Sequence, residues 1–148
     1  MECLINSSVK KTVVSNKYIK SVITIVLTSF PKYKNSSLSV NLVGEKRIQT
    51  LNNLYRGKDK VTDDLAFALQ DVKTPADDVQ DLGDVFICIP QIKKQAQEFD
   101  VSFKEEFTRI LVHGILHLLG FDHVKEKDAK KMFLFQEKIV HIHLRSSK

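Results

Sequence analysis

Apolar residues recur along the chain with two different spacings, which predict a mixture of helices and strands. Residues 18–30 carry apolar side chains every three or four positions and are followed by Pro31, so we predict an amphipathic helix that ends there. Residues 38–43 alternate between apolar and polar side chains, which is typical of a strand with one buried face. Similar patterns predict helices at residues 45–55, 91–99 and 126–140 and a strand at residues 64–69.

The second half of the chain contains the clearest elements. An uninterrupted apolar run at residues 85–89 predicts a strand that is buried on both faces. Ser102 is a candidate N-cap with Glu105 three positions later, and helical spacing continues from there as far as Gly120. Between residues 71 and 81 an acidic stretch predicts an exposed loop. This order of elements predicts an α+β domain with one small mixed β-sheet packed by helices.

Length and composition indicate one domain. The chain has 148 residues, of which 43% are hydrophobic, so it can bury about two-thirds of its unfolded surface in one core. We therefore expect a single domain over residues 1–148. Cys3 and Cys88 are too few for a disulfide framework, and we find neither a secretory signal nor an apolar run of bilayer-spanning length. The expectation is a soluble, cytoplasmic protein with no membrane partner.

Charge is distributed unevenly along the chain. Residues 1–60 hold eleven basic and three acidic side chains, residues 61–100 hold three and nine, and residues 101–148 hold nine and six. The corresponding net charges are +8, −6 and +3, which sum to +5. A surface that binds nucleic acid next to a site that holds a cation would explain this distribution. Lysines on solvated surfaces would also explain it, so charge alone leaves both interpretations open.

Three histidines form the pattern with the most specific chemistry. His113 and His117 are four positions apart near the end of the strongest predicted helix, so both imidazoles project from one face. Gly120 then allows the chain to leave the helix and to turn His123 back toward them. Three imidazoles with an open fourth position are typical of a catalytic zinc site, and the alternative is a chance alignment of core histidines. We predict one Zn2+ ion bound by His113, His117 and His123.

The histidine spacing equals that of the zincin peptidase motif H-E-x-x-H-x-x-G-x-x-H except at one position. Gly114 stands where the glutamate general base of a peptidase belongs. Glycine can neither activate water nor pass a proton to an amine leaving group, so a peptidase is disfavoured. A metal-activated nucleophile can still attack a phosphodiester if the protein supplies a cation for the charge that develops on the phosphate.

Three segments carry a family resemblance: LNNLYRGKDKVTDDLAF at residues 51–67, LGDVFICIP at residues 82–90 and HGILHLLGFDH at residues 113–123. Together they resemble the YbeY family of bacterial endoribonucleases and rRNA maturation factors. The resemblance implies a single-domain, zinc-binding α+β fold related to the zincins. It also implies processing of the 3′ end of small-subunit rRNA and ribosome quality control, with single-stranded rRNA, the small ribosomal subunit and its assembly factors as partners.

The resemblance also assigns roles to individual residues. It makes His113, His117 and His123 the metal ligands, and it makes Arg56 the residue that holds a substrate phosphate. Arginine suits this role because its planar guanidinium can bind two phosphate oxygens at once, and two lysines follow within four positions. The alternative is a solvated arginine at a helix end. On this basis Arg56 and His113 are the candidate catalytic residues.

Several positions depart from the family pattern. Val61 replaces a usual proline, and Asp64 and Ala66 replace a usual valine and serine. Cys88 replaces a serine, and it is either an inert thiol in a buried strand or a fourth metal ligand. Three aspartates either accept a hydrogen bond from a metal-bound imidazole or cap local structure: Asp63, Asp84 and Asp122. Two further histidines, His141 and His143, have no such context, and we interpret them as ordinary surface or terminal residues.

These observations favour one function over two others. The leading hypothesis is a zinc-dependent, single-strand-specific endoribonuclease that acts in rRNA maturation, with water or a ribose hydroxyl as the nucleophile and Arg56 on the phosphate. The second is a ribosome-associated RNA-binding assembly factor with a structural metal. The third is a small metallohydrolase that acts on a substrate other than nucleic acid. The sequence leaves the native metal, the scissile bond and the oligomeric state open.

Overall fold

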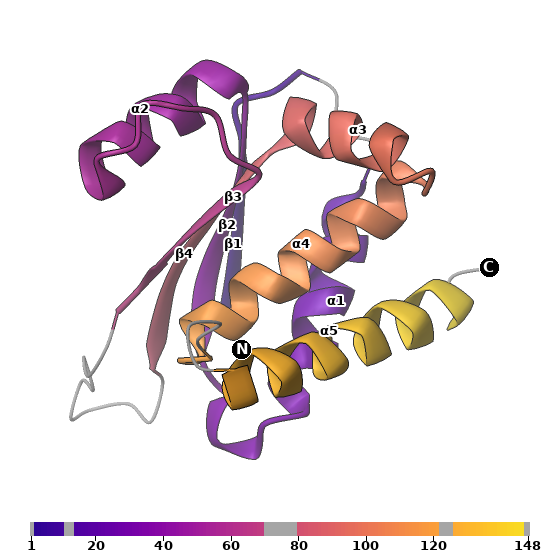
Figure 1. Ribbon diagram of the computed structural model, residues 1–148. Helices are drawn as coiled ribbons and strands as arrows, with labels where there is room; N and C mark the ends of the chain where they lie inside the picture. Colours follow the sequence, from indigo (N-terminus) through magenta and orange to yellow (C-terminus); the bar gives the residue numbers. More distant parts are fainter. Residues whose placement is uncertain (1, 11–13, 70–79, 122–125, 147–148) are drawn as a thin grey trace.

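The computed structural model describes residues 2–10, 14–69, 80–121 and 126–146, which contain one four-stranded sheet (Figure 1). The sheet is mixed, because three strands are parallel and the fourth, at one edge, runs antiparallel to its neighbour. In spatial order the strands are β1 (Glu2–Ser7), β2 (Ser37–Val43), β4 (Asp81–Cys88) and the antiparallel β3 (Asp64–Ala68). The predicted α+β fold is confirmed.

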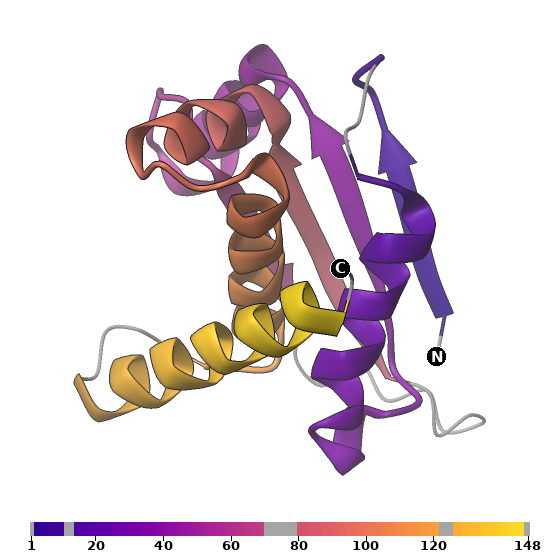
Figure 2. The ribbon, with the colours of Figure 1, turned by 90° about the vertical axis from the view of Figure 1, so that its right-hand side faces the viewer.

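Helices cover both faces of this sheet. On one face two helices pack side by side and a third crosses them, whereas a single helix covers the opposite face (Figures 1 and 2). Among the described residues, no helix combines the length and the apolar character needed to cross a membrane. The helices are α1 (Asn16–Thr28), α4 (Phe103–Leu118) and the crossing α5 (Glu126–Ser146) on the first face, α2 (Glu45–Arg56) on the second, α3 (Ile89–Glu98) between β4 and α4, and the short 3-10 helix η1 (Pro31–Tyr33) before β2.

The alternation of side chains along the strands divides the core into two parts. The larger part lies between the sheet and the α1–α4 layer and includes Val40 of β2 and Val85 of β4. The smaller part lies under α2 and contains Val43, Ile48, Leu51, Leu65 and Cys88. Edge strand β3 contributes to both, because Leu65 packs under α2 while Ala66 packs against the larger core. Asp64, two positions from Ala66, therefore faces α4.

Helix α4 carries two of the predicted ligands and forms as its sequence predicts. The Ser102 hydroxyl oxygen accepts a hydrogen bond from the backbone N–H of Glu105 (3.1 Å), which caps the first turn. The helix ends at Leu118, and Gly120 follows in the left-handed region with φ 96°. Side chains such as Phe107 and Ile115 are fully buried along its inner side. The capping residues thus define where α4 begins and ends, and its buried side defines which face it turns toward the sheet. Neither depends on a bound ligand.

Some element boundaries differ from the prediction. Strand β1 was not predicted, because it is an edge strand in which Leu4 is 62% exposed and the apolar alternation is weak. Ile89 begins α3 instead of ending β4, since a proline in the first helical turn needs no partner for a backbone N–H. The predicted acidic loop lies mostly at residues 70–79, outside the described residues.

His143 is a buried residue, which corrects its interpretation as a surface or terminal side chain. Helix α5 continues to Ser146, beyond the predicted end at residue 140, and this places His143 against α1. Its Nε2 atom lies 3.1 Å from the hydroxyl oxygen of Ser21, and its ring meets that of Tyr18 edge-on at 4.8 Å between centroids. His141 is exposed, as predicted.

Candidate active site

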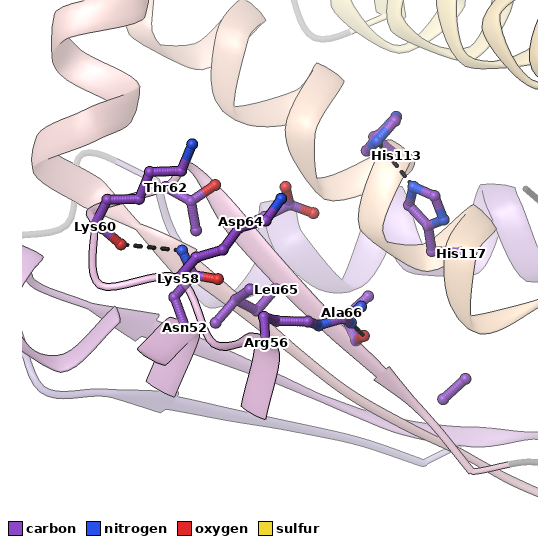
Figure 3. A pocket seen from close by; sticks show the side chains of 11 residues that line it. Asn52, Arg56, Lys58, Lys60, Thr62, Asp64, Leu65, Ala66, His113 and His117 are labelled. Carbon is purple, nitrogen blue, oxygen red and sulfur yellow. Dashed lines mark hydrogen bonds between the residues drawn. The ribbon is translucent and has the colours of Figure 1, made fainter. Parts of the chain in front are cut away.

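The histidine pair of α4 converges on one point. His113 and His117 project from successive turns, and their Nε2 atoms lie 3.0 Å apart (Figure 3). The other ring nitrogen of His113, Nδ1, lies 2.9 Å from the side-chain oxygen of Gln136 on α5. Helix geometry therefore aims the Nε2 atoms of two imidazoles at the same small volume, as a shared metal ion requires.

The donor set of this pair fits zinc. Two nitrogens that bind one tetrahedral zinc ion lie about 3.3 Å apart, close to the separation observed here. Among the described residues, no third histidine, cysteine, aspartate or glutamate completes a three-ligand set with them. The predicted third ligand, His123, and its neighbour Asp122 lie outside the described residues, so their assignment stays a prediction.

Gly114 lies where α4 comes closest to the sheet. A Cβ atom at this position would lie 2.8 Å from Cγ1 of Val85 on β4 and 3.4 Å from Oδ2 of Asp64 on β3. A contact of 2.8 Å is shorter than real Cβ contacts, so a larger residue fits here only if the Val85 side chain, the sheet or the helix shifts. The packing of α4 on β4 therefore favours the glycine that replaces the peptidase glutamate.

A cavity of about 750 Å³ opens beside the histidine pair (Figure 3). Its walls come from the consecutive elements α2, the segment after it and β3, and from α4, which is distant from them in the sequence. Its lining consists of Asn52, Arg56, Lys58, Lys60, Thr62, Asp64, Leu65, Ala66, Ala68, His113 and His117. Arg56, His113 and His117, which were predicted from separate motifs, therefore share one cavity.

Arg56 is held at the edge of β3. It is the last residue of α2, and Gly57 ends the helix in the left-handed region with φ 69°. One terminal nitrogen of Arg56 donates a hydrogen bond to the backbone oxygen of Ala66 (2.9 Å), and the guanidinium carbon lies 5.7 Å from the centroid of the Phe67 ring. These contacts hold the guanidinium along the cavity wall. A solvated arginine at a helix end would lack such contacts.

Asp64 is a titratable lining residue that the sequence analysis did not assign to the site. Burial, together with the neighbouring Asp63 carboxyl, raises its pKa well above the usual value, although Arg56 opposes the shift. Its one signal along the chain is an acidic residue at a position where the resemblance implies valine. Its proximity to Gly114 is a tertiary contact, and no motif spacing predicts it.

The other candidate aspartates serve local structure. A carboxylate oxygen of Asp63 accepts a hydrogen bond from the backbone N–H of Asp64 (2.8 Å), at the start of β3. Asp84 accepts a hydrogen bond from the hydroxyl group of Ser39 across the β2–β4 pair. For both residues these contacts match the capping alternative and not a role next to the histidines.

Cys88 lies in the smaller core under α2. Its side chain is fully buried among apolar neighbours, and this burial raises the pKa of the thiol above its ordinary value. A thiol that remains protonated is a poor metal ligand. Because Cys88 is also not part of the cavity lining, its environment matches the inert alternative.

A mixed α+β fold with a histidine pair and three cationic side chains in one open cavity defines a class of protein: a small hydrolase for an anionic substrate. Comparison with known proteins gives the family. Residues 4–143 match the family model described as endoribonuclease YbeY. The chain belongs to this family of metal-dependent enzymes, which hydrolyse phosphodiester bonds in RNA.

Individual relatives agree over nearly the whole chain. The endoribonuclease YbeY of Persephonella marina is 40% identical over 92% of this chain and 88% of its own length. That of Ureaplasma parvum is 37% identical over 95% of this chain and 90% of its own length. The solution structure of TM1509 from Thermotoga maritima matches with a TM-score of 0.68 and 29% identity, covering 98% of this chain and 93% of that one.

Proposed function

We propose that this endoribonuclease cleaves single-stranded rRNA during maturation of the 3′ end of the small-subunit rRNA, with one zinc ion held by His113, His117 and His123. The observation that supports the proposal most directly is the shared cavity, in which the histidine pair and Arg56 face the same volume. The small ribosomal subunit and its assembly factors are the proposed partners, and the cytoplasm is the proposed location.

The residues of the cavity have different roles in phosphodiester hydrolysis. A bound zinc ion would supply positive charge that polarises the scissile phosphate and lowers the pKa of a nucleophile. Arg56 has five N–H donors, and the hydrogen bond to Ala66 orients this fork so that its remaining donors can bind the phosphate oxygens. As charge builds up on the phosphate during attack, a guanidinium fixed in advance stabilises it without rearrangement.

Lys58 and Lys60 extend the positive charge along the same wall. As mobile point charges they can follow an irregular backbone, and this favours a flexible strand as the substrate. An A-form duplex holds its phosphates in a fixed geometry that resists adjustment to a site recessed beside a helix. We therefore expect unstructured RNA to be cleaved in preference to a duplex.

The two other hypotheses predict different behaviour. An assembly factor with a structural metal would hold its ion in a closed site, whereas the histidine pair lines an open cavity with room for a substrate. A metallohydrolase for an uncharged substrate would not need three cationic side chains in the cavity that holds the metal ligands. The cavity thus supports the nuclease over both alternatives.

Cleavage of an unstructured RNA by the purified protein tests this proposal. His117→Ala should lower the rate by about a hundredfold or more while the circular dichroism spectrum is unchanged, because the metal supplies several kcal/mol of transition-state stabilisation. His141→Ala is the matched control, since His141 is exposed and outside the cavity. Zinc binding with no RNA cleavage would favour the assembly factor, and hydrolysis of small phosphoesters alone would favour the third hypothesis.

Metal content tests the ligand assignment separately. After purification with zinc present, elemental analysis should find about one equivalent per chain, and the triple variant His113→Ala, His117→Ala, His123→Ala should lose it. Less than about half an equivalent in the parent, or unchanged content in the triple variant, would show that these histidines are not the metal site.

A further inference from the structure

A buried glutamine of α5 contacts the first predicted ligand from outside the cavity. Gln136 is 6% exposed, and its side-chain oxygen lies 2.9 Å from Nδ1 of His113. It does not line the cavity, so it can influence the chemistry there only through the imidazole. The question is which of the two groups donates the proton in this hydrogen bond.

The surroundings of Gln136 answer that question. Its amide nitrogen donates a hydrogen bond to a carboxylate oxygen of Glu137 (3.3 Å). That carboxylate is held by Arg109 of α4, whose Nε and one terminal nitrogen donate to its two oxygens at 2.9 and 3.0 Å. The Arg109 hydrogen bonds lower the pKa of Glu137, so its carboxylate remains ionised and can only accept. The amide nitrogen of Gln136 must therefore face Glu137, and its oxygen must face His113.

The orientation of the amide then fixes the proton on the histidine. An amide oxygen is an acceptor, so Nδ1 of His113 has to carry the hydrogen. A neutral imidazole has only one N–H, which leaves a lone pair on Nε2, the atom that lies 3.0 Å from Nε2 of His117. Nε2 of His113 is thus prepared to bind a metal, whereas the opposite tautomer would have to be converted first.

We propose that Gln136 is a positioning residue, which acts with Glu137 and Arg109 to hold His113 as the Nδ1–H tautomer with its Nε2 lone pair aimed into the cavity. The part of this inference that concerns zinc rests on the proposed function. The tautomer itself is a property of the protein without metal and stands independently of it. Outer hydrogen-bond partners of this kind change metal affinity by about 10- to 100-fold when they are removed.

The first experiment determines the tautomer directly. Imidazole nitrogen-15 shifts of the full-length, metal-free protein at a pH where His113 is neutral should identify Nδ1 as the protonated nitrogen. Gln136→Met, which keeps the length and apolar bulk of the side chain, should abolish this preference. A metal-free parent in which His113 carries its hydrogen on Nε2 would overturn the proposal.

A second glutamine provides the matched control. Gln95 of α3 is partly buried, and its amide nitrogen donates to Glu106 (2.9 Å), another carboxylate bonded to Arg109. Gln95→Met removes a similar hydrogen bond from the same network without touching a histidine. It should reduce thermal stability about as much as Gln136→Met does, yet leave the tautomer of His113 unchanged. A change of tautomer in Gln95→Met would show that general loosening is responsible, and would overturn the specific role of Gln136.

Zinc affinity is the second readout. Titration with zinc against a competing chelator should show binding weakened about 10- to 100-fold in Gln136→Met and within about threefold of the parent in Gln95→Met. Equal affinity in the parent and Gln136→Met would refute the proposal. A parent that binds no zinc at all would instead refute the proposed metal site, while the nitrogen-15 result would still decide the tautomer.

Discussion

At the level of single residues, Arg56 gives the sharpest test of the cavity. Arg56→Ala should leave folding and metal content intact, because the residue is exposed, but it should reduce RNA cleavage by about 10²- to 10³-fold through loss of preorganised charge stabilisation. Arg56→Lys should recover only part of the rate, since lysine is a point charge without the guanidinium fork. The measurement is the cleavage rate at fixed salt.

Arg47 is the control for this series. It lies on the same helix α2 and is exposed, but it does not line the cavity. Arg47→Ala should therefore cleave RNA like the parent. Equal activity of Arg56→Ala and the parent would show that the contact with Ala66 is only structural.

Gly114 allows a test of the packing between α4 and the sheet. Alanine in place of glycine stabilises a helix by up to about 1 kcal/mol, whereas the forced contact with Val85 costs about 1–3 kcal/mol. The second effect should dominate, and Gly114→Ala should lower the free energy of unfolding by about 1 kcal/mol in urea titrations. Val85→Ala makes room for the new methyl group, so the double variant should be more stable than the sum of the two single effects predicts. Strict additivity would contradict the close contact.

At the level of secondary-structure elements, the contact between α5 and α1 includes a titratable side chain, His143. His143 is buried against α1, and this burial, with a smaller effect from the charge on Lys104, lowers its pKa below the usual value of 6.5. The folded protein thus binds the proton of His143 less well than the unfolded chain does. Its contribution to stability is complete above about pH 6.5 and is lost as the pH falls through the lowered pKa.

This contribution can be isolated by comparing two proteins. Between pH 7 and pH 5 the parent should lose more stability than His143→Phe, whose ring can still pack against Tyr18 but cannot take up a proton. The difference amounts to about 1.4 kcal/mol for each unit by which the pKa is lowered. Urea titrations at both pH values measure it, and other titrating groups cancel because both proteins contain them. Parallel losses in the two proteins would exclude His143 as the cause.

The elements that the sequence predicted well have strong local signals. Helix α4 combines an N-cap, a long apolar period and a glycine after its end, and each signal acts within a few residues. Strand β1 has no such signals, because it is an exposed edge strand whose place in the sheet is set by its pairing with β2. His113 and His117 were predictable because they share one helix. The contacts of Asp64 with Gly114 and of Gln136 with His113 join residues 50 and 23 positions apart, and no pattern along the chain encodes them.

At the level of the whole molecule, the fold shows where the unevenly distributed charges of the sequence lie relative to the cavity. The basic first portion contributes Arg56, Lys58 and Lys60 to the cavity lining, and among the described residues Asp64 is the only acidic side chain that the acidic middle contributes to it. The cavity therefore presents three cationic side chains and one carboxyl whose raised pKa favours its neutral form. Of the two interpretations that charge alone left open, this arrangement favours an anion-binding surface, because all three cationic side chains line the same cavity as the histidine pair.

The resulting prediction concerns the salt dependence of RNA binding. Each phosphate that a cation neutralises on a single strand lowers the slope of log K against log salt by about 0.7, so three contacts give a slope of about −2 and an affinity loss of about 20-fold between 50 and 200 mM salt. In the double variant Lys58→Ala, Lys60→Ala the slope should become shallower, at about −0.7. The matched control is Lys32→Ala, Lys34→Ala, which removes the same charge beside η1 and away from the cavity lining, and should leave the slope near that of the parent. Fluorescence anisotropy with an unstructured RNA measures all three slopes. A parent whose affinity is flat across this range, or a control that changes the slope as much as the cavity variant does, would show that RNA does not bind along this wall.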